Sequence, residues 1–224
     1  MICQYNLPLG LSFPNIELDE TNILRVRPAS KPNPRALAKA QSLADLLPFC
    51  RIGSPEIYNL AAILICSTIQ LSQTPWLRQG LSKERIYFKS ASNEPTYTFQ
   101  FPYLHNTFQS NQKQSITAPA NDSSLLLSLA VVLLEIATGK TIEDLRQPID
   151  AAANAETSNY LTTSRSLVAS DLPTDYKIAV FTGAKAFYDP NANLASPEYV
   201  KDIKTDVLGR IEQELSYSLS TPAR

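Results

Sequence analysis

His105 is the only histidine of the sequence, so it is the only imidazole available as a general base. A cysteine could act as a nucleophile beside it, and the candidates for such a pair are Cys50 and Cys66. The neighbours of His105, Tyr103-Leu-His-Asn106, match no nucleophile motif. We therefore expect a loop histidine with a hydrogen bond. The alternative is an enzyme that uses His105 with a thiol or a carboxylate.

The residue types give little indication of a metal site or of a phosphate-binding site. One histidine excludes a centre that needs two imidazoles, and we predict no metal site and no cofactor. Thr138-Gly-Lys-Thr141 looks like the end of a P-loop, but position 134 is Leu where that motif has its first glycine. We interpret this segment as a helix C-terminus. Glu143 and Asp144 are expected to cap the next helix and complement its dipole.

A basic segment surrounds the single tryptophan, Trp76. Arg78, Lys83, Arg85 and Lys89 follow it within a short stretch of chain. Tryptophan is enriched at binding hot spots, and basic side chains suit an acidic partner or a phosphate group. The alternatives are a packing aromatic and a solvated basic face. We select Trp76, Arg78, Lys83 and Arg85 as candidate contacts with a protein partner.

The composition is that of a globular protein with a core of its own. The 224 residues are 44% hydrophobic, and 20 basic against 21 acidic side chains give a net charge of −1. Such a chain has no global field to attract nucleic acid or an anionic membrane. The longest apolar run, Leu125–Ala137, is shorter than the roughly 20 residues that span a bilayer. Three widely spaced cysteines and the lack of a signal-peptide pattern indicate an intracellular, cytoplasmic protein.

The sequence predicts three regions along the chain. Residues 1–35 are rich in proline and predict an irregular arm with one edge strand in Asn22–Arg27. Residues 36–219 predict a mainly α domain with one small β-hairpin, in which Ile86–Phe88 pairs with Tyr97–Phe101. Residues 220–224 form a tail.

Apolar periodicity and capping residues predict the helices of this domain. A helix from Pro55 to Ser72 follows the N-cap Ser54, and the apolar Leu125–Ala137 helix ends at Gly139. In the Asp175–Tyr188 helix the inward residues are expected to be Ile178, Ala179, Phe181 and Ala184. The other predicted helices are Arg35–Leu47, a short one from Thr141, Thr157–Ser170, and Pro197–Leu219 after the N-cap Ser196.

The segment Ser128-Leu-Ala-Val-Val-Leu-Leu-Glu-Ile-Ala-Thr-Gly-Lys140 resembles the buried central helix of the protein-kinase C-lobe. The Glu56–Ser72 helix and the Ser82–Phe88 segment stand where kinases place the helix before the catalytic loop and the end of that loop. More specifically, the chain resembles an uncharacterised fungal family of kinase-like C-lobe domains, found alone or beside HeLo-type, prion-associated signalling modules. The motifs that support this resemblance lie within residues 40–215, at Ser42–Leu47, Ile57–Leu71, Thr74–Leu77, Ser82–Phe88, Pro102–Leu104 and Leu133–Arg146.

The resemblance implies a kinase-C-lobe-like fold without an N-lobe and without the kinase reaction. It places the His-Arg-Asp triplet of the catalytic loop on Arg78, Gln79 and Gly80, and the metal-binding asparagine on Arg85. A kinase needs an aspartate to accept the substrate hydroxyl proton, which Gly80 cannot do. Residues 90–121 contain no Asp or Gly that could form the Asp-Phe-Gly motif.

We therefore expect a non-catalytic, pseudokinase-like interaction or signalling domain with a protein partner. Its biological process and oligomeric state are left open by the sequence. Two alternatives stand beside this hypothesis. One is an enzyme of a non-kinase class that uses His105 with a thiol or carboxylate, and the other is a truncated gene product with no retained role.

Overall fold

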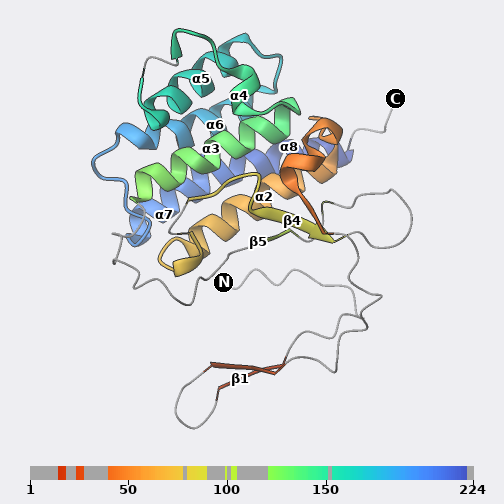
Figure 1. Cartoon of the computed structure of the whole chain (residues 1–224), viewed down its shortest axis with the longest axis vertical. Coiled ribbons are helices and arrows are strands. Elements are labelled where there is room, and N and C mark those ends of the chain that lie inside the picture. Colours follow the sequence, from red (N-terminus) through yellow and green to blue (C-terminus); the bar gives the residue numbers. More distant parts are fainter. Residues whose placement is uncertain are drawn as a thin grey trace. The chain divides into compact units, whose positions relative to one another are not determined.

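The computed structural model (Figure 1) describes residues 15–18, 24–27, 40–77, 80–89, 99, 102–104, 121–150 and 153–220. The chain forms two compact units, Met1–Lys39 and Ala40–Arg224. In the first unit, β1 (Asn15–Leu18) pairs antiparallel with β2 (Leu24–Arg27). The strand predicted within Asn22–Arg27 is therefore confirmed, and its partner is an upstream strand that the prediction did not include.

The second unit is mainly helical with a small antiparallel sheet, which confirms the predicted fold class at that level (Figure 1). Short 3₁₀ turns lie at Leu47–Phe49, Pro75–Leu77 and Ala186–Tyr188, and a π-helical turn at Lys204–Leu208 joins the last two helices. The helices are α1 (Leu43–Leu46), α2 (Pro55–Leu71), α3 (Asp122–Thr138), α4 (Ile142–Leu145), α5 (Ala155–Ala169), α6 (Thr174–Lys185), α7 (Pro197–Ile203) and α8 (Gly209–Ser220).

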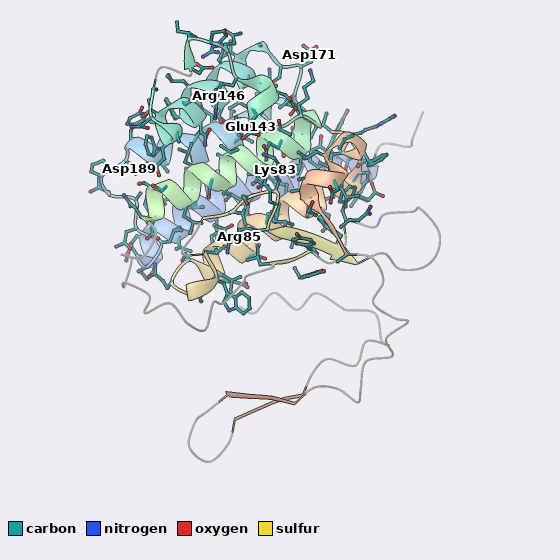
Figure 2. The ribbon with its side chains drawn as sticks, in the orientation of Figure 1. Lys83, Arg85, Glu143, Arg146, Asp171 and Asp189 are labelled. Carbon is teal, nitrogen blue, oxygen red and sulfur yellow. The ribbon has the colours of Figure 1, made fainter. Side chains whose placement is uncertain are left out.

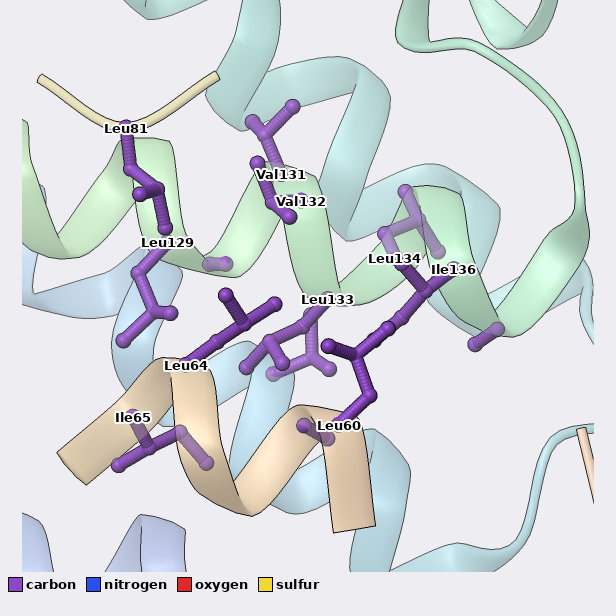
Figure 3. Packing of buried hydrophobic residues seen from close by; sticks show 14 of the residues in the cluster. Leu60, Leu64, Ile65, Leu81, Leu129, Val131, Val132, Leu133, Leu134 and Ile136 are labelled. Carbon is purple, nitrogen blue, oxygen red and sulfur yellow. The ribbon is translucent and has the colours of Figure 1, made fainter. Parts of the chain in front are cut away.

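Helix α3 is the centre of this unit. It is apolar around its whole circumference and nearly every residue from Leu125 to Ala137 is buried, so it must be covered on all sides. Helices α2, α4, α5 and α6 pack against it. Figure 3 shows Leu60 and Leu64 of α2 pointing toward Leu133 of α3. The core therefore forms around the segment that the sequence predicts to be most buried.

Helix α6 packs on α3 through small residues. An added Cβ at Gly183 would lie 3.4 Å from the Cβ of Ala130, so the two helices approach closely there. The prediction that Ile178 and Phe181 point inward is wrong, because their exposed fractions are 37% and 43%. Ala179 and Ala184 are buried as predicted, and Tyr176, Val180 and Gly183 complete the buried face.

The structure also changes the predicted start of the second unit. Ser42 forms a reciprocal capping box with Asp45, so the helix begins at Leu43 and not within a longer Arg35–Leu47 helix. Residues 40–42 are extended and form β3. Residues 35–39 lie outside the described residues.

The described sheet has three strands, in the order β3 (Ala40–Ser42), β4 (Ile86–Lys89) and β5 (Tyr103–Leu104). Gln41 lies opposite Phe88, and Ile86 lies opposite Leu104. In the part of the chain that the structure describes, both strands that pair with Ile86–Phe88 lie outside its predicted partner, Tyr97–Phe101. Within that range the structure describes only Phe99, which is buried in a turn.

Local capping chemistry sets most of the remaining helix ends. Gly139 adopts the left-handed conformation after α3, and Thr141 forms the predicted capping box with Asp144. Ser196 caps α7 by accepting a hydrogen bond from the Tyr199 N–H. Helices α3 and α5 begin two or three residues before their predicted starts, because Asn121 and Asn154 are their N-caps.

A buried carboxylate fixes the link between α4 and α5. Asp150 is fully buried and accepts hydrogen bonds from both terminal nitrogens of Arg165. It also accepts bonds from the Thr162 hydroxyl at 3.0 Å and the Gln147 N–H at 3.1 Å. The hydrogen bond from Arg165 lowers the pKa of Asp150 to about 2, which keeps this carboxylate charged at neutral pH.

The substitution Gly139→Ala should destabilise the protein. Gly139 has φ +66, and an added Cβ would lie 3.1 Å from the Leu47 carbonyl oxygen and 3.2 Å from that of Cys50. The left-handed conformation alone costs about 1–2 kcal/mol for a residue with a side chain, and the crowding adds to it. Urea denaturation measures the change. The control is Gly209→Ala at a helical φ of −57, which should gain up to about 1 kcal/mol. Equal effects of the two substitutions would contradict this account of Gly139.

Candidate functional site

The segment from Pro75 to Arg85 connects α2 to β4 and contains the candidate contact residues (Figure 2). Trp76 is 41% exposed, Arg85 is half-buried and Lys83 is only 9% exposed. Arg78 lies outside the described residues. The structure brings Trp76 and Arg85 together, whereas the Lys83 ammonium points toward α3 and α4.

Arg85 closes the loop that follows Trp76. Its Nη1 donates to the Gly80 carbonyl oxygen at 2.6 Å, and its Nη2 donates to the Trp76 carbonyl oxygen at 2.9 Å. Both acceptors are neutral, and among the residues that the structure describes no carboxylate forms an ion pair with this guanidinium. Burial lowers the pKa of Arg85, but an arginine remains charged at neutral pH.

Gly80 and Ser128 fix the turn before β4. Gly80 has φ +73, a left-handed conformation that favours glycine, and its N–H donates to the Leu77 carbonyl oxygen at 2.9 Å. The next N–H, that of Leu81, donates to the Ser128 hydroxyl of α3 at 3.0 Å. The Ser128 hydroxyl in turn donates to the Leu125 carbonyl oxygen at 2.7 Å. The loop is thus attached directly to the central helix.

Lys83 joins the loop to α3 and α4 through an ion cluster. Its Nζ lies 2.9 Å from Glu135 Oε1, 2.9 Å from Glu143 Oε2 and 3.3 Å from Glu84 Oε1. Glu135 is 1% exposed, and its Oε1 also accepts the Ile142 N–H at 2.8 Å. One buried carboxylate therefore connects Lys83 with the first residue of α4.

The pKa values in this cluster follow from burial and pairing. Burial raises the pKa of Glu135, and the hydrogen bond from Lys83 opposes that rise. Burial disfavours the charged form of Lys83, but hydrogen bonds to Glu135 and Glu143 outweigh it and raise the pKa of Lys83. Burial also acts against the charge on Glu143, and the bond from Lys83 reverses this and lowers its pKa. Lys83 therefore acts as an internal counter-ion.

An apolar cavity of about 240 Å³ lies beside Trp76. Side chains of the C-terminal half of α2, of the loop and of strands β4 and β5 line it. The described lining residues are Leu64, Ser67, Thr68, Leu71, Trp76, Leu77, Leu81, Ile86, Pro102, Tyr103 and Leu104. Because Arg85 binds the backbone on both sides of Leu77, the same bonds that close the loop also shape one wall of this cavity.

A second hollow, of about 200 Å³, lies on the other side of the loop and contains the Lys83 cluster. Its described lining is mixed, with Glu84, Glu143, Glu156 and Asn159 beside aliphatic residues such as Leu127, Val131 and Val132. The Lys83 ammonium is already bound to three carboxylates there. The two sides of the loop therefore differ in chemistry, with an apolar cavity on one and an ion cluster on the other.

For the alternative catalytic pair, the structure describes the two candidate thiols, Cys50 and Cys66, but not the histidine. His105 and Cys3 lie outside the described residues. Burial raises the pKa of Cys50 to about 12, so its thiol is protonated at neutral pH and is a poor nucleophile. Cys66 is partly buried, less so than a core residue. Among the residues that the structure describes, no three His, Cys, Asp or Glu side chains are grouped so that they could hold a metal ion.

The fold and the loop define a mainly α domain with a small antiparallel sheet and an internally anchored loop after α2. A family model matches residues 13–182, and the chain belongs to this family, which is described as a domain of unknown function (DUF7580). No curated protein and no solved structure matches the chain. Across the described part of the chain, no helix is both long enough and apolar enough to cross a membrane.

Sequence reasoning selected Lys83 but missed its partners. Glu135 is the one charged residue in the apolar α3 segment, and a charge in such a helix needs a buried partner. That single feature could have indicated an ion pair, although not with which cation. Ser128 gave no comparable indication, because a serine in a helix commonly bonds to its own backbone.

The substitution Lys83→Met should cost about 3–5 kcal/mol of unfolding free energy, because it leaves Glu135 buried without a cation. Restoring neutrality with Lys83→Met/Glu135→Gln should recover most of this loss, since Gln keeps an acceptor for the Ile142 N–H. Chemical denaturation measures both variants, with the exposed Lys140→Met as the control. A loss no larger than that of Lys140→Met would contradict the proposed role of the ion pair.

The same variant should show a pH dependence of known sign. Without Lys83 the pKa of Glu135 rises further above its unfolded value, so the folded state binds the proton more tightly. Stability then increases as the pH falls from neutral toward the unfolded pKa of a glutamate. The deficit of Lys83→Met relative to the wild type should therefore shrink between pH 7 and about pH 5. A deficit that is constant over this range would show that Glu135 is not the group responsible.

Proposed function

We propose that this protein is a non-catalytic, pseudokinase-like interaction domain that binds a protein partner through the Trp76 loop. The observation that supports it is the position of Trp76, a partly exposed indole at an apolar cavity. It lies on a loop that Arg85 closes and that Ser128 attaches to α3. Interfaces concentrate their binding energy in such aromatic anchors. A rigidly held anchor also loses little entropy on binding.

The kinase resemblance adds to this proposal residue by residue. It places the catalytic aspartate on Gly80, whose φ of +73 would strain any residue with a side chain. It places the metal-binding asparagine on Arg85, whose guanidinium is bonded to two carbonyl oxygens of the loop. Neither position then has the aspartate or asparagine that phosphoryl transfer needs, which supports the proposal of a non-catalytic role.

We further propose that the protein belongs to a fungal group of such domains and works inside the cell, in the cytoplasm. The fungal assignment comes from the sequence resemblance given above. The cellular location follows from three widely spaced cysteines that do not form a disulfide framework pattern. In this context the function is scaffolding or signalling by protein contact.

The protein should not bind ATP in a Mg²⁺-dependent manner. Titration calorimetry with ATP and Mg²⁺ should give no saturable heat, and the thermal unfolding temperature should not change beyond its variation in Mg²⁺ alone. An active protein kinase measured in the same buffer is the positive control. Micromolar, Mg²⁺-dependent ATP binding would contradict the pseudokinase-like proposal.

The substitution Trp76→Ala should reduce partner binding without loss of the fold. Wild-type and variant proteins are expressed at equal levels in the native cell, captured, and compared by quantitative mass spectrometry. A hot-spot residue predicts about a tenfold or larger loss of specifically captured protein. The matched control is Val168→Ala, which removes an 86% exposed apolar side chain from α5. Thermal unfolding establishes that both variants fold, and equal capture by wild type and Trp76→Ala would contradict this site.

A further inference from the structure

We infer that the cavity beside Trp76 binds one large apolar side chain from an acidic segment of a partner protein. This inference rests on the proposed function and adds the chemistry of the partner to it. The occupant is a short peptide segment in which a residue of the size of Leu or Phe is flanked by Asp or Glu.

The size and lining of the cavity support an apolar side chain as the group that enters it. The volume, about 240 Å³, lies below the range of roughly 300–1,000 Å³ that is usual for cofactors and drug-sized ligands. Most of the described lining is aliphatic or aromatic, and the Thr68 hydroxyl is already bonded to the Leu64 carbonyl oxygen at 2.8 Å. A polar group inside the cavity would therefore find few partners, which makes its burial costly.

The charges next to the cavity support an acidic flank. Arg85 adjoins Ile86, a lining residue, and donates hydrogen bonds to the carbonyl oxygens of Gly80 and of Trp76, which also lines the cavity. These two bonds use two of its five N–H donors, and no carboxylate within the described part of the chain pairs with its charge. A carboxylate on the partner segment would form charge-assisted hydrogen bonds with this guanidinium. By contrast, Lys83 attracts no further anion, because its charge is compensated by Glu135, Glu143 and Glu84.

The experiment is a selection from a display library of random peptides on the immobilised full chain. The inference predicts that the enriched peptides share one large apolar residue with Asp or Glu beside it. Enrichment of peptides with basic flanks, or no enrichment over an uncoated surface, would overturn the inference. The result does not depend on knowing the natural partner.

Two substitutions on α2 test whether the selected peptides enter the cavity. Ser67→Phe places a ring in it, whereas Gln70→Phe places the same ring on the exposed side of α2. Trp76 is the only tryptophan of the chain, so its fluorescence reports peptide binding directly. We expect Ser67→Phe to lower the affinity for an enriched peptide at least tenfold and Gln70→Phe to leave this affinity unchanged. Thermal unfolding establishes that both variants fold. Equal binding to both variants would overturn the cavity as the site.

Ionic strength tests the contribution of Arg85 without altering the loop that it closes. Affinity for an enriched peptide should fall severalfold between low salt and 1 M salt, and replacement of its Asp or Glu by the amide should remove most of this dependence. A salt-independent affinity would contradict the acidic flank. If the selection fails but Trp76→Ala still loses its captured proteins, the partner chemistry is wrong and the proposed function stands.

Discussion

The ion pair between Lys83 and Glu135 is the interaction on which the geometry of the loop depends. Helix α3 is apolar on all sides, and it holds a carboxylate at 1% exposure. Such a group is stable as a charge only with a cation and a hydrogen-bond donor beside it, and Lys83 and the Ile142 N–H are these partners. This requirement holds Lys83 against α3. It therefore also fixes the position of the turn from Ser82 to Arg85, which precedes β4.

Because this turn is fixed, the residues near it in sequence are held in place as well. Arg85 comes two residues after Lys83 and reaches back to the carbonyl oxygens of Gly80 and Trp76. The Leu81 N–H is bonded to Ser128 of α3 in the same loop. The indole of Trp76 and the apolar cavity beside it are thus held by bonds that end in the central helix. This arrangement supports the functional proposal, because a binding surface that is already rigid loses little conformational entropy when a partner binds.

Features that depend on residues close in sequence could be predicted, whereas features that depend on contacts between distant segments were mostly missed. The caps at Gly139, Thr141 and Ser196 act within one turn, and sequence reasoning placed them correctly. The pairing of β4 with β3 and β5 depends on segments far apart in sequence and was not found. The inward face of α6 was predicted only in part: Ala179 and Ala184 are buried, but Ile178 and Phe181 are exposed. For the candidate site, the sequence led us to select Trp76 and Arg85 but did not predict the hydrogen bond between them.

Amide hydrogen exchange at Gly80 and Leu81 is the measurement that tests most directly whether the Trp76 loop is held by the core. Both N–H groups are bonded, to the Leu77 carbonyl oxygen and the Ser128 hydroxyl. The account predicts that they exchange only when the protein opens extensively, with protection similar to that of the buried amides of α2. Exchange at the rate of an unstructured peptide, while α2 and α3 stay protected, would contradict it. The loop would then have no fixed geometry with which to bind a partner.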